Sequence, residues 1–457
     1  MGNVGLNFGS ATSGAGFDVT ATVNQIVTNL QAVEMPWKTQ LTNLANQDAQ
    51  LSSLGTQLST LTTDLHNLTD FSGIFAAKQG SSSNTNVLSL TSASTSAVAG
   101  THTVTVQSLA QTSTAASGVV AASDVLAGSV SIQVGSGAVQ TVNVNASNPT
   151  LAGLAAAINA ASIGVTATVL TDTNGARLSV VSSTPGAAGT LTVSSGLTDT
   201  TTASSAVSFS QIQTGLDASM LVDGVQLTSA SNTVTNAIPG VTFQLLSAPS
   251  PASSIQVVIT NDTTSVASAI QTFVTDYNKV MKAINTQEGK DSSGNPEPLF
   301  GSTVLAQLQQ SLQGALNATF GSGAVSSAYS LGITANQDGT ISLNTDTLTS
   351  MLNTNYSDVS AFFQNAGSFG ASFANTLNNL GSSYSTGAIT LALNENKSQE
   401  ANLNDDIARQ EALIATQKTN LTAELNAANQ ILQSIPAQIN QINEMYSAIT
   451  GYSKTQG

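Results

Sequence analysis

The chain has 457 residues, which is enough for two to four domains. Only 8% of the residues are charged, far below the typical share of about 25%, and the net charge is −15. This balance excludes a basic surface for nucleic acid or anionic membranes. The absence of cysteine excludes disulfides, thiolate catalysis and thiolate metal sites.

The first residues, from Met1 to Val19, are polar and glycine-rich, without the basic flank and apolar core of a cleavable signal peptide. No stretch approaches the roughly 18 apolar residues that a membrane-spanning helix needs. We therefore expect a soluble protein without membrane insertion. Any export has to use a route that needs no cleavable signal.

A heptad pattern predicts a long helix between Val23 and Leu68, with apolar positions spaced alternately by three and four residues. Leaving such a stripe in water costs roughly 1.5 to 3 kcal/mol for each large side chain, so this helix needs a partner. A second heptad pattern begins at Leu403 and can supply it. We predict that the two terminal helices pair antiparallel in a coiled-coil-like stem, although an ordinary helical core would produce the same periodicity.

The apolar positions of both patterns are the predicted interface, either a helix seam within the chain or an oligomer contact. They are Val23, Ile26, Leu30, Val33, Leu51, Leu54, Leu58, Leu61, Leu65, Ile407, Ile414, Leu421, Ile431, Ile435, Ile442 and Ile449. Because proline removes a backbone donor and clashes with the preceding turn, Pro36 and Pro436 should each kink or restart a helix. Antiparallel pairing of the ends is expected to bring the two prolines side by side.

Segments with alternating polarity and turn residues predict β-rich domains between the two helical ends. The predicted strands are 86–90, 100–109, 129–134, 139–144, 165–170, 177–181, 218–222, 225–228, 241–246 and 255–260. A helix capped by Thr150 completes a hairpin, helix, hairpin unit that ends near Ser208. Helical spacing then predicts helices from Ser265 and over 302–316, a hairpin over 331–343 and short helices over 348–352 and 359–363.

Few residues could carry chemistry. The two histidines, His66 and His102, are predicted on the first helix and on a strand face, and no glycine-rich phosphate loop precedes a helix. Asp223, Asp291 and Asp338 stand in turns, where hydrogen bonds to their own backbone explain them. We predict no enzymatic activity, no catalytic residue, no metal site and no cofactor.

Short motifs follow one another along nearly the whole chain. They are Gly16-Phe17-Asp18-Val19, Ala32-Val33-Glu34-Met35-Pro36, Ala99-Gly100-Thr101-His102-Thr103-Val104-Thr105-Val106, Val222-Asp223-Gly224, Ile238-Pro239-Gly240-Val241-Thr242, Phe273-Val274-Thr275-Asp276-Tyr277-Asn278 and Leu331-Gly332-Ile333 followed by Asp338-Gly339-Thr340. In this order they resemble the flagellar filament cap family, flagellar hook-associated protein 2. The unit over 154–183 is similar to the β-α-β motif of surface domains in caps, flagellins and hook proteins.

The resemblance implies an α+β multidomain protein, with paired terminal helices as a stem and β-rich domains looped out from the middle of the chain. The implied domains are an N-terminal leg helix (1–39), an N-terminal stem helix of a helical domain (40–78), the first part of an inner β domain (79–115), an inserted outer domain with the β-α-β unit (116–207), the second part of the inner β domain (208–262), the helical domain with the C-terminal stem helix (263–435) and a C-terminal leg helix (436–457).

The resemblance also implies an extracellular protein of the bacterial flagellum, exported through the flagellar type III apparatus to the filament tip. There it would form a homo-oligomeric ring that helps exported flagellin fold and insert during filament elongation. The implied partners are flagellin, the hook-filament junction proteins and an export chaperone before secretion. A role in cell adhesion is left open.

Two other functions are compatible with parts of the sequence. A flagellin or a hook-filament junction protein also has paired terminal helices, but the helix from Phe273 and the hairpin from Leu331 lie where a cap has them. A secreted carbohydrate-active enzyme or adhesin would need aromatic side chains that stack on sugars, and aromatic residues make up only 4% of the chain.

Overall fold

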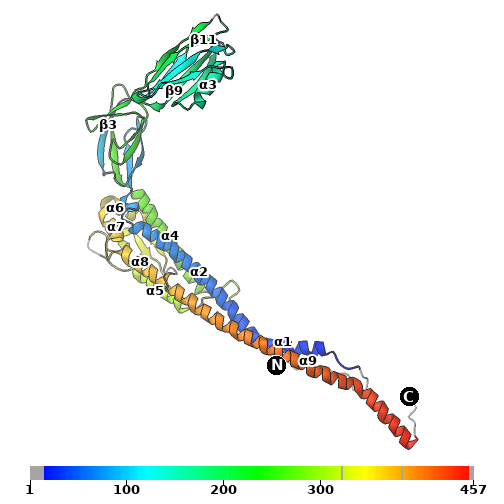
Figure 1. Cartoon of the computed structure of the whole chain (residues 1–457). Coiled ribbons are helices and arrows are strands. Elements are labelled where there is room, and N and C mark those ends of the chain that lie inside the picture. Colours follow the sequence, from blue (N-terminus) through cyan, green and yellow to red (C-terminus); the bar gives the residue numbers. More distant parts are fainter. Residues whose placement is uncertain (1–14, 203, 321–322, 382–383, 452–457) are drawn as a thin grey trace. The chain divides into compact units, whose positions relative to one another are not determined.

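The computed structural model describes residues 15–202, 204–320, 323–381 and 384–451, and the chain divides into two compact units (Figure 1). The first unit combines the residues up to Thr69 with those from Ala269 onward, and the second comprises Asp70–Ser268. Long helices lie near both ends of the sequence, and the strands are concentrated between them. The predicted α+β class is confirmed.

The first unit is mainly helical. Its helices are α1 (Val19–Gln31), α2 (Met35–Thr69), α4 (Thr263–Gln287, which begins in the second unit), α5 (Thr303–Leu316), α6 (Thr345–Thr354), α7 (Tyr356–Gln364), α8 (Phe369–Leu380) and α9 (Ala388–Thr450). Single 3-10 turns occur at Ala32–Glu34 and Ala328–Leu331, and β19 (Ile333–Ala335) pairs with β20 (Ile341–Leu343). Within the described residues, no helix is both long and apolar enough to cross a membrane.

The break between α1 and α2 follows from Pro36. Proline is tolerated in the first turn of a helix, where its missing N–H is not needed. Accordingly α1 ends at Gln31, a 3-10 turn follows, and α2 begins at Met35, so the predicted restart is confirmed. At Pro436 the chain behaves differently, because α9 continues through the proline to Thr450 without a second start.

Helix α9 (orange to red in Figure 1) runs antiparallel to α1 and α2 (blue). The Asn429 side chain meets Phe17, the Glu411 carboxylate lies 3.9 Å from the Lys38 ammonium, and the Asn396 amide donates to Asp48 at 2.7 Å. The two prolines are therefore not side by side, and that prediction is wrong. This register places Pro36 close to residue 411 of α9, far along the helix from Pro436.

The core of the first unit begins halfway along α2. From Leu51 onward the seam leucines Leu51, Leu54, Leu58, Leu61, Leu65 and Leu68 are buried, and α2 packs against α7 and α8 as well as α9. The ring of Phe273 on α4 meets Phe373 on α8 edge to face, with centroids 5.4 Å apart. The stem interpretation therefore holds for the first half of α2, and the helical-core interpretation holds for the second half.

The second unit contains two separate buried clusters. Around the first lie β1 (Lys78–Ser82), β2 (Leu88–Ala93), β3 (Gly100–Ser108), β14 (Ala218–Val222), β15 (Val225–Ser229), β16 (Thr233–Thr235), β17 (Val241–Leu245) and β18 (Ser254–Asn261), in sheets ordered β1-β18-β3-β14-β15 and β16-β17-β2. The central strand β3 pairs antiparallel with β18 and β14 and buries Val104 and Val106 completely.

The second cluster lies among the strands and the helix of residues 112–213. These are β4 (Thr112–Ser117), β5 (Leu126–Ala127), β6 (Ser129–Val134), β7 (Gln140–Asn143), α3 (Leu151–Ala160), β8 (Val165–Asp172), β9 (Gly175–Pro185), β10 (Leu191–Ser195), β11 (Leu197–Asp199), β12 (Ser205–Val207) and β13 (Phe209–Gln213), in sheets β10-β6-β7, β12-β11-β5 and β13-β4-β9-β8. The Asn159 amide exchanges two hydrogen bonds of 2.8 Å with the Ala167 backbone and so fixes α3 on β8.

Candidate assembly surface on the terminal helices

The predicted interface residues fall into three groups in the structure. Those buried within the chain are Val23, Leu51, Leu54, Leu58, Leu61, Leu65 and Ile414; those half-buried are Ile26, Leu30, Ile407, Leu421 and Ile435; and those exposed are Val33, Ile431, Ile442 and Ile449. Val33 departs from the seam because it lies in the 3-10 turn, which interrupts the helical period and leaves its side chain 54% exposed.

The start of α1 is tied to α9 by a short clasp, which we call the N-terminal clasp and define as Gly16, Phe17 and Asn429. The Phe17 N–H donates to Asn429 Oδ1 at 2.9 Å, and Asp18 caps α1 by accepting from the Ala21 N–H at 2.9 Å. Gly16 has a φ of +67°, and a Cβ there would overlap the Asn429 amide. Only glycine therefore fits this close approach without strain.

An ion pair between Glu34 and Lys38 stabilises the joint between α1 and α2. The Glu34 side chain is 1% exposed, and its Oε2 lies 2.8 Å from the Lys38 ammonium. That hydrogen bond raises the pKa of Lys38 above its usual value, and the more distant Glu411 adds a smaller effect of the same sign. Glu34 Oε1 is buried without a hydrogen-bond partner among the described residues, so the joint carries an unsatisfied polar atom.

Past the clasp, α9 presents an apolar stripe that is largely open to solvent. We call it the tail stripe: Ile431, Ile435, Ile439, Ile442, Met445, Tyr446 and Ile449. At about 100° per residue these side chains fall within roughly a third of the helix circumference. Ile442 is 60% exposed and Ile449 is 84% exposed.

The electrostatics of the tail stripe favour apolar docking. Between Leu425 and Thr450 the only charged residue is Glu444, whose position in the helical period puts it on the opposite face. Burying each large apolar side chain of the stripe would contribute roughly 1.5 to 3 kcal/mol. An exposed apolar surface of this kind usually marks a site of protein contact.

The turn carboxylates behave as expected at two of three positions. Asp338 accepts from the Thr340 N–H at 3.0 Å, and Asp291 accepts from Ser293 and Asn295 in its own loop. The prediction for Asp223 is wrong, because its carboxylate bonds the neighbouring strand β3 and not its own turn. It accepts from the Thr103 N–H and meets His102 Nδ1, both at 2.7 Å, and these bonds lower the pKa of Asp223.

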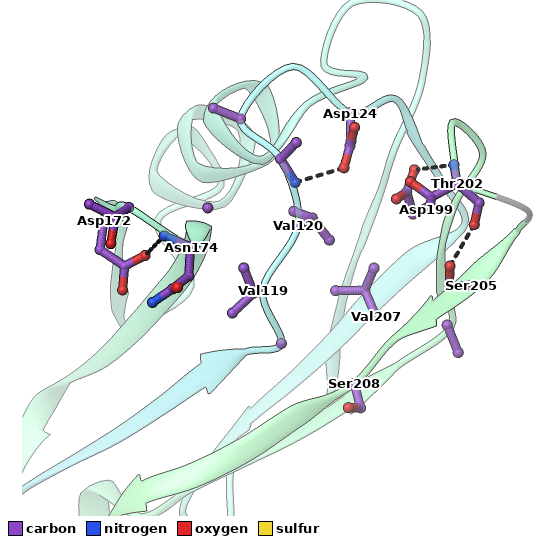
Figure 2. A pocket seen from close by; sticks show the side chains of 16 residues that line it. Val119, Val120, Asp124, Asp172, Asn174, Asp199, Thr202, Ser205, Val207 and Ser208 are labelled. Carbon is purple, nitrogen blue, oxygen red and sulfur yellow. Dashed lines mark hydrogen bonds between the residues drawn. The ribbon is translucent and has the colours of Figure 1, made fainter.

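A polar hollow of about 620 Å³ lies among the loops at one end of the second cluster (Figure 2). Its carboxylates are already engaged: Asp124 accepts from Ala121, Asp172 from Asn174, and Asp199 from the Thr201 and Thr202 N–H groups. The hydrogen bond from the Thr202 side chain is the main cause that lowers the pKa of Asp199, and the two N–H groups add to it. Across the described ranges, no group of three or more potential ligand side chains is placed to hold a metal ion.

Long antiparallel helices from the two ends of the chain, with β sheets between them in the sequence, define the class as an α+β multidomain protein with paired terminal helices. The profile "Flagellar hook-associated protein 2 C-terminus" matches residues 215–447, and the profile "Flagellar hook-associated protein 2 N-terminus" matches residues 15–113. The chain therefore belongs to the flagellar hook-associated protein 2 family, and the resemblance seen in the sequence motifs is confirmed.

Individual relatives agree with the family. The B-type flagellar hook-associated protein 2 of Pseudomonas aeruginosa is 29% identical over 398 residues, which cover 79% of this chain and 81% of the relative. The flagellar hook-associated protein 2 of Escherichia coli is 28% identical over 468 residues, which cover 95% and 93%. A crystal structure of the flagellar cap protein FliD from Escherichia coli superposes with a TM-score of 0.57 at 26% identity, over 76% of this chain and 99% of that one.

Proposed function

We propose that this chain is a filament cap: a homo-oligomeric ring at the tip of the bacterial flagellum that promotes the folding and insertion of exported flagellin as the filament grows. The observation that carries the proposal is the tail stripe, an apolar and nearly uncharged surface left exposed by a member of this family. An exposed apolar surface of this kind usually marks a site where neighbouring molecules bind. The cap ring and the filament end supply those neighbours.

Composition supports assembly through apolar and neutral polar contacts. With 8% charged residues, the surface has few charges to desolvate or to screen. We propose flagellin and the hook-filament junction proteins as partners at the filament, an export chaperone as the partner before secretion, and the extracellular filament tip as the location. We propose no catalytic role, and an adhesive role is secondary.

The alternative of a flagellin or junction protein receives less support. The matching relatives are flagellar hook-associated proteins 2, and the superposed structure is that of a flagellar cap protein. We also propose the domain limits predicted from the sequence. The two separate buried clusters in the second unit support them.

The proposal is tested by the oligomeric state of the purified full chain. Light scattering after size exclusion and negative-stain images are expected to show closed rings. The double variant Ile442→Ser, Ile449→Ser should weaken the rings, while Val98→Ser, which changes a side chain that is 73% exposed outside the stem, should not. A strict monomer at every attainable concentration would contradict the proposal.

A further inference from the structure

We propose that Asp64, Asp276 and Lys279 form a proton-dependent clasp between α2 and α4, closed while Asp64 carries a proton and opened when the proton leaves. We call it the acid clasp. It lies in the contact between the two helices, away from the tail stripe, and the proposed cap function does not use it.

The acid clasp brings two carboxyl groups and one ammonium group together. Asp276 is 8% exposed, and its Oδ1 lies 2.5 Å from the Lys279 ammonium. The Asp64 carboxyl group lies close enough to Asp276 for the two to act on each other, and two negative charges there would repel, which favours one proton on the pair. Lys279 holds Asp276 in its charged form, so the proton belongs to Asp64.

The surroundings of Asp64 disfavour its charged form. Its Oδ2 is buried and has no hydrogen-bond partner among the described residues. One heptad earlier on α2, Gln57 Oε1 is buried and unpartnered too, and on α4 the same holds for the Tyr277 hydroxyl. Asp64 as a whole is half-buried, but a charged carboxylate whose buried oxygen has no donor is disfavoured, so loss of the proton leaves a charge that the helix contact does not compensate.

The positive charge of Lys279 opposes this effect, but it is a smaller cause than burial and Asp276, which raise the pKa of Asp64. Asp276 and Lys279 are the charged groups on α4 that act on Asp64, and burial raises the pKa of the neighbouring Tyr277, which stays neutral. Helix α8 has no titratable side chain, and on α7 Asp358 is bound to the Ala324 N–H at 2.9 Å. Burial is the main cause that raises the pKa of Asp64 to about 6, followed by Asp276.

The acid clasp lies near both points where the chain passes between its two units. Asp64 precedes the end of α2 at Thr69, where the chain leaves the first unit, and α4 brings it back at Ala269. Helices α2 and α4 are also joined farther along, where the Gln287 amide donates to Gln50 Oε1 at 3.3 Å. Opening of the clasp therefore removes the contact between α2 and α4 near these points, while their contact at Gln50 and Gln287 persists.

The sign of the pH effect follows from linkage. Because the pKa of Asp64 is about 6 in the folded chain and about 3.9 in an unfolded one, its stabilising contribution is complete below pH 4. The contribution is lost as the pH rises through 6. Since each unit of pKa corresponds to a factor of ten and only the unit between pH 5 and the pKa near 6 contributes, the clasp should weaken by about tenfold between pH 5 and pH 7.

The test is a titration of the full chain with ¹³C-labelled aspartate carboxyls, in which the signal absent from Asp64→Asn identifies Asp64. We expect this signal to titrate near pH 6. In parallel, the exchange of amides in the last turns of α2, corrected for the intrinsic rate, should rise by up to about tenfold from pH 5 to pH 7. Asp64→Asn should abolish this rise, and Asp405→Asn, at an exposed position on α9, should preserve it.

A second variant keeps the test decisive if Asp64→Asn does not fold. In Asp276→Asn the new amide can donate to Asp64, so the Asp64 midpoint should fall by more than about one pH unit. An Asp64 signal that titrates near pH 4 in the unaltered chain, or amide exchange in α2 that is equal at pH 5 and pH 7, would overturn the acid clasp.

Discussion

Replacing Gly16 by alanine should release α1 from α9 without unfolding the rest of the first unit. Two effects act together in this variant. A residue with a side chain at a φ of +67° costs about 1 to 2 kcal/mol. The new Cβ also displaces the Asn429 amide, and the lost hydrogen bond from Phe17 costs about 0.5 to 1.5 kcal/mol more.

The sum is about 1.5 to 3.5 kcal/mol, and it acts on a helix of low intrinsic stability. Helix α1 has 13 residues, near the length at which an isolated helix is marginal in water, and it buries only Val19 and Val23. At 1.4 kcal/mol for each factor of ten, local opening of α1 should increase roughly 10- to 300-fold. The Leu58 region of α2 lies in the separate helical core and should keep its protection.

Hydrogen exchange with mass spectrometry on the full chain measures this effect directly. Gly314→Ala is the matched control, because no atom lies within 4 Å of its added Cβ and alanine favours the interior of α5 by about 0.5 to 1 kcal/mol. The control should therefore leave α1 unchanged. Equal exchange of α1 in Gly16→Ala and the unaltered chain would refute the N-terminal clasp.

Three further predictions follow from the same structure. Leu58→Ala, at a fully buried position, should lower the free energy of unfolding by about 2 to 5 kcal/mol, whereas Ile442→Ala should change it by less than about 0.5 kcal/mol. Urea denaturation measures both changes, and equal effects would contradict the burial pattern. The hydrogen bonds to Asp223 lower its pKa, so the ionised carboxylate stabilises the fold above pH 4 and this stabilisation is lost on further acidification. Asp223→Asn should therefore reduce the acid dependence of the thermal unfolding temperature. An unchanged acid dependence would contradict this role of Asp223. Rings should persist when NaCl is raised from about 0.1 to 1 M, as light scattering can show, and dissociation by salt would indicate ionic contacts instead.

Periodicity predicted both long helices, since an apolar residue every three or four positions has one structural explanation over such lengths. It did not predict their register. The side-by-side prolines were inferred from symmetry of the chain ends, whereas specific contacts such as Phe17 with Asn429 set the pairing. A heptad pattern also does not show whether other side chains bury its apolar positions. Leu58 and Ile449 occupy equivalent positions in such patterns, yet Leu58 is fully buried and Ile449 is exposed.

Other elements were missed because distant contacts stabilise them. Helix α8 contains Gly370 and three asparagines, which are poor helix formers, and it is held by Phe369 and Phe373 packing on the Phe273 ring. Strands β4 and β13 lack large apolar alternation and depend on pairing between segments far apart in sequence.

The acid clasp left only a faint signal in the sequence. Asp64 shares a heptad position with Gln50 and Gln57, next to the leucine seam, which marks a polar line along α2. That Asp276 faces it could be learned only from the packing of α4 on α2. The Asp223 contact with β3 likewise depends on strand pairing across more than a hundred residues.

The central claim is that the tail stripe of α9 is the surface through which the cap acts, and truncation tests it most directly. A motile strain whose only copy of this chain lacks residues 437–457 would be compared with one carrying the full chain, by electron microscopy of filaments and by assay of flagellin in the medium. The account predicts a folded, secreted truncation, no filament growth, and unpolymerised flagellin released into the medium. Normal filaments from the truncated chain would contradict it.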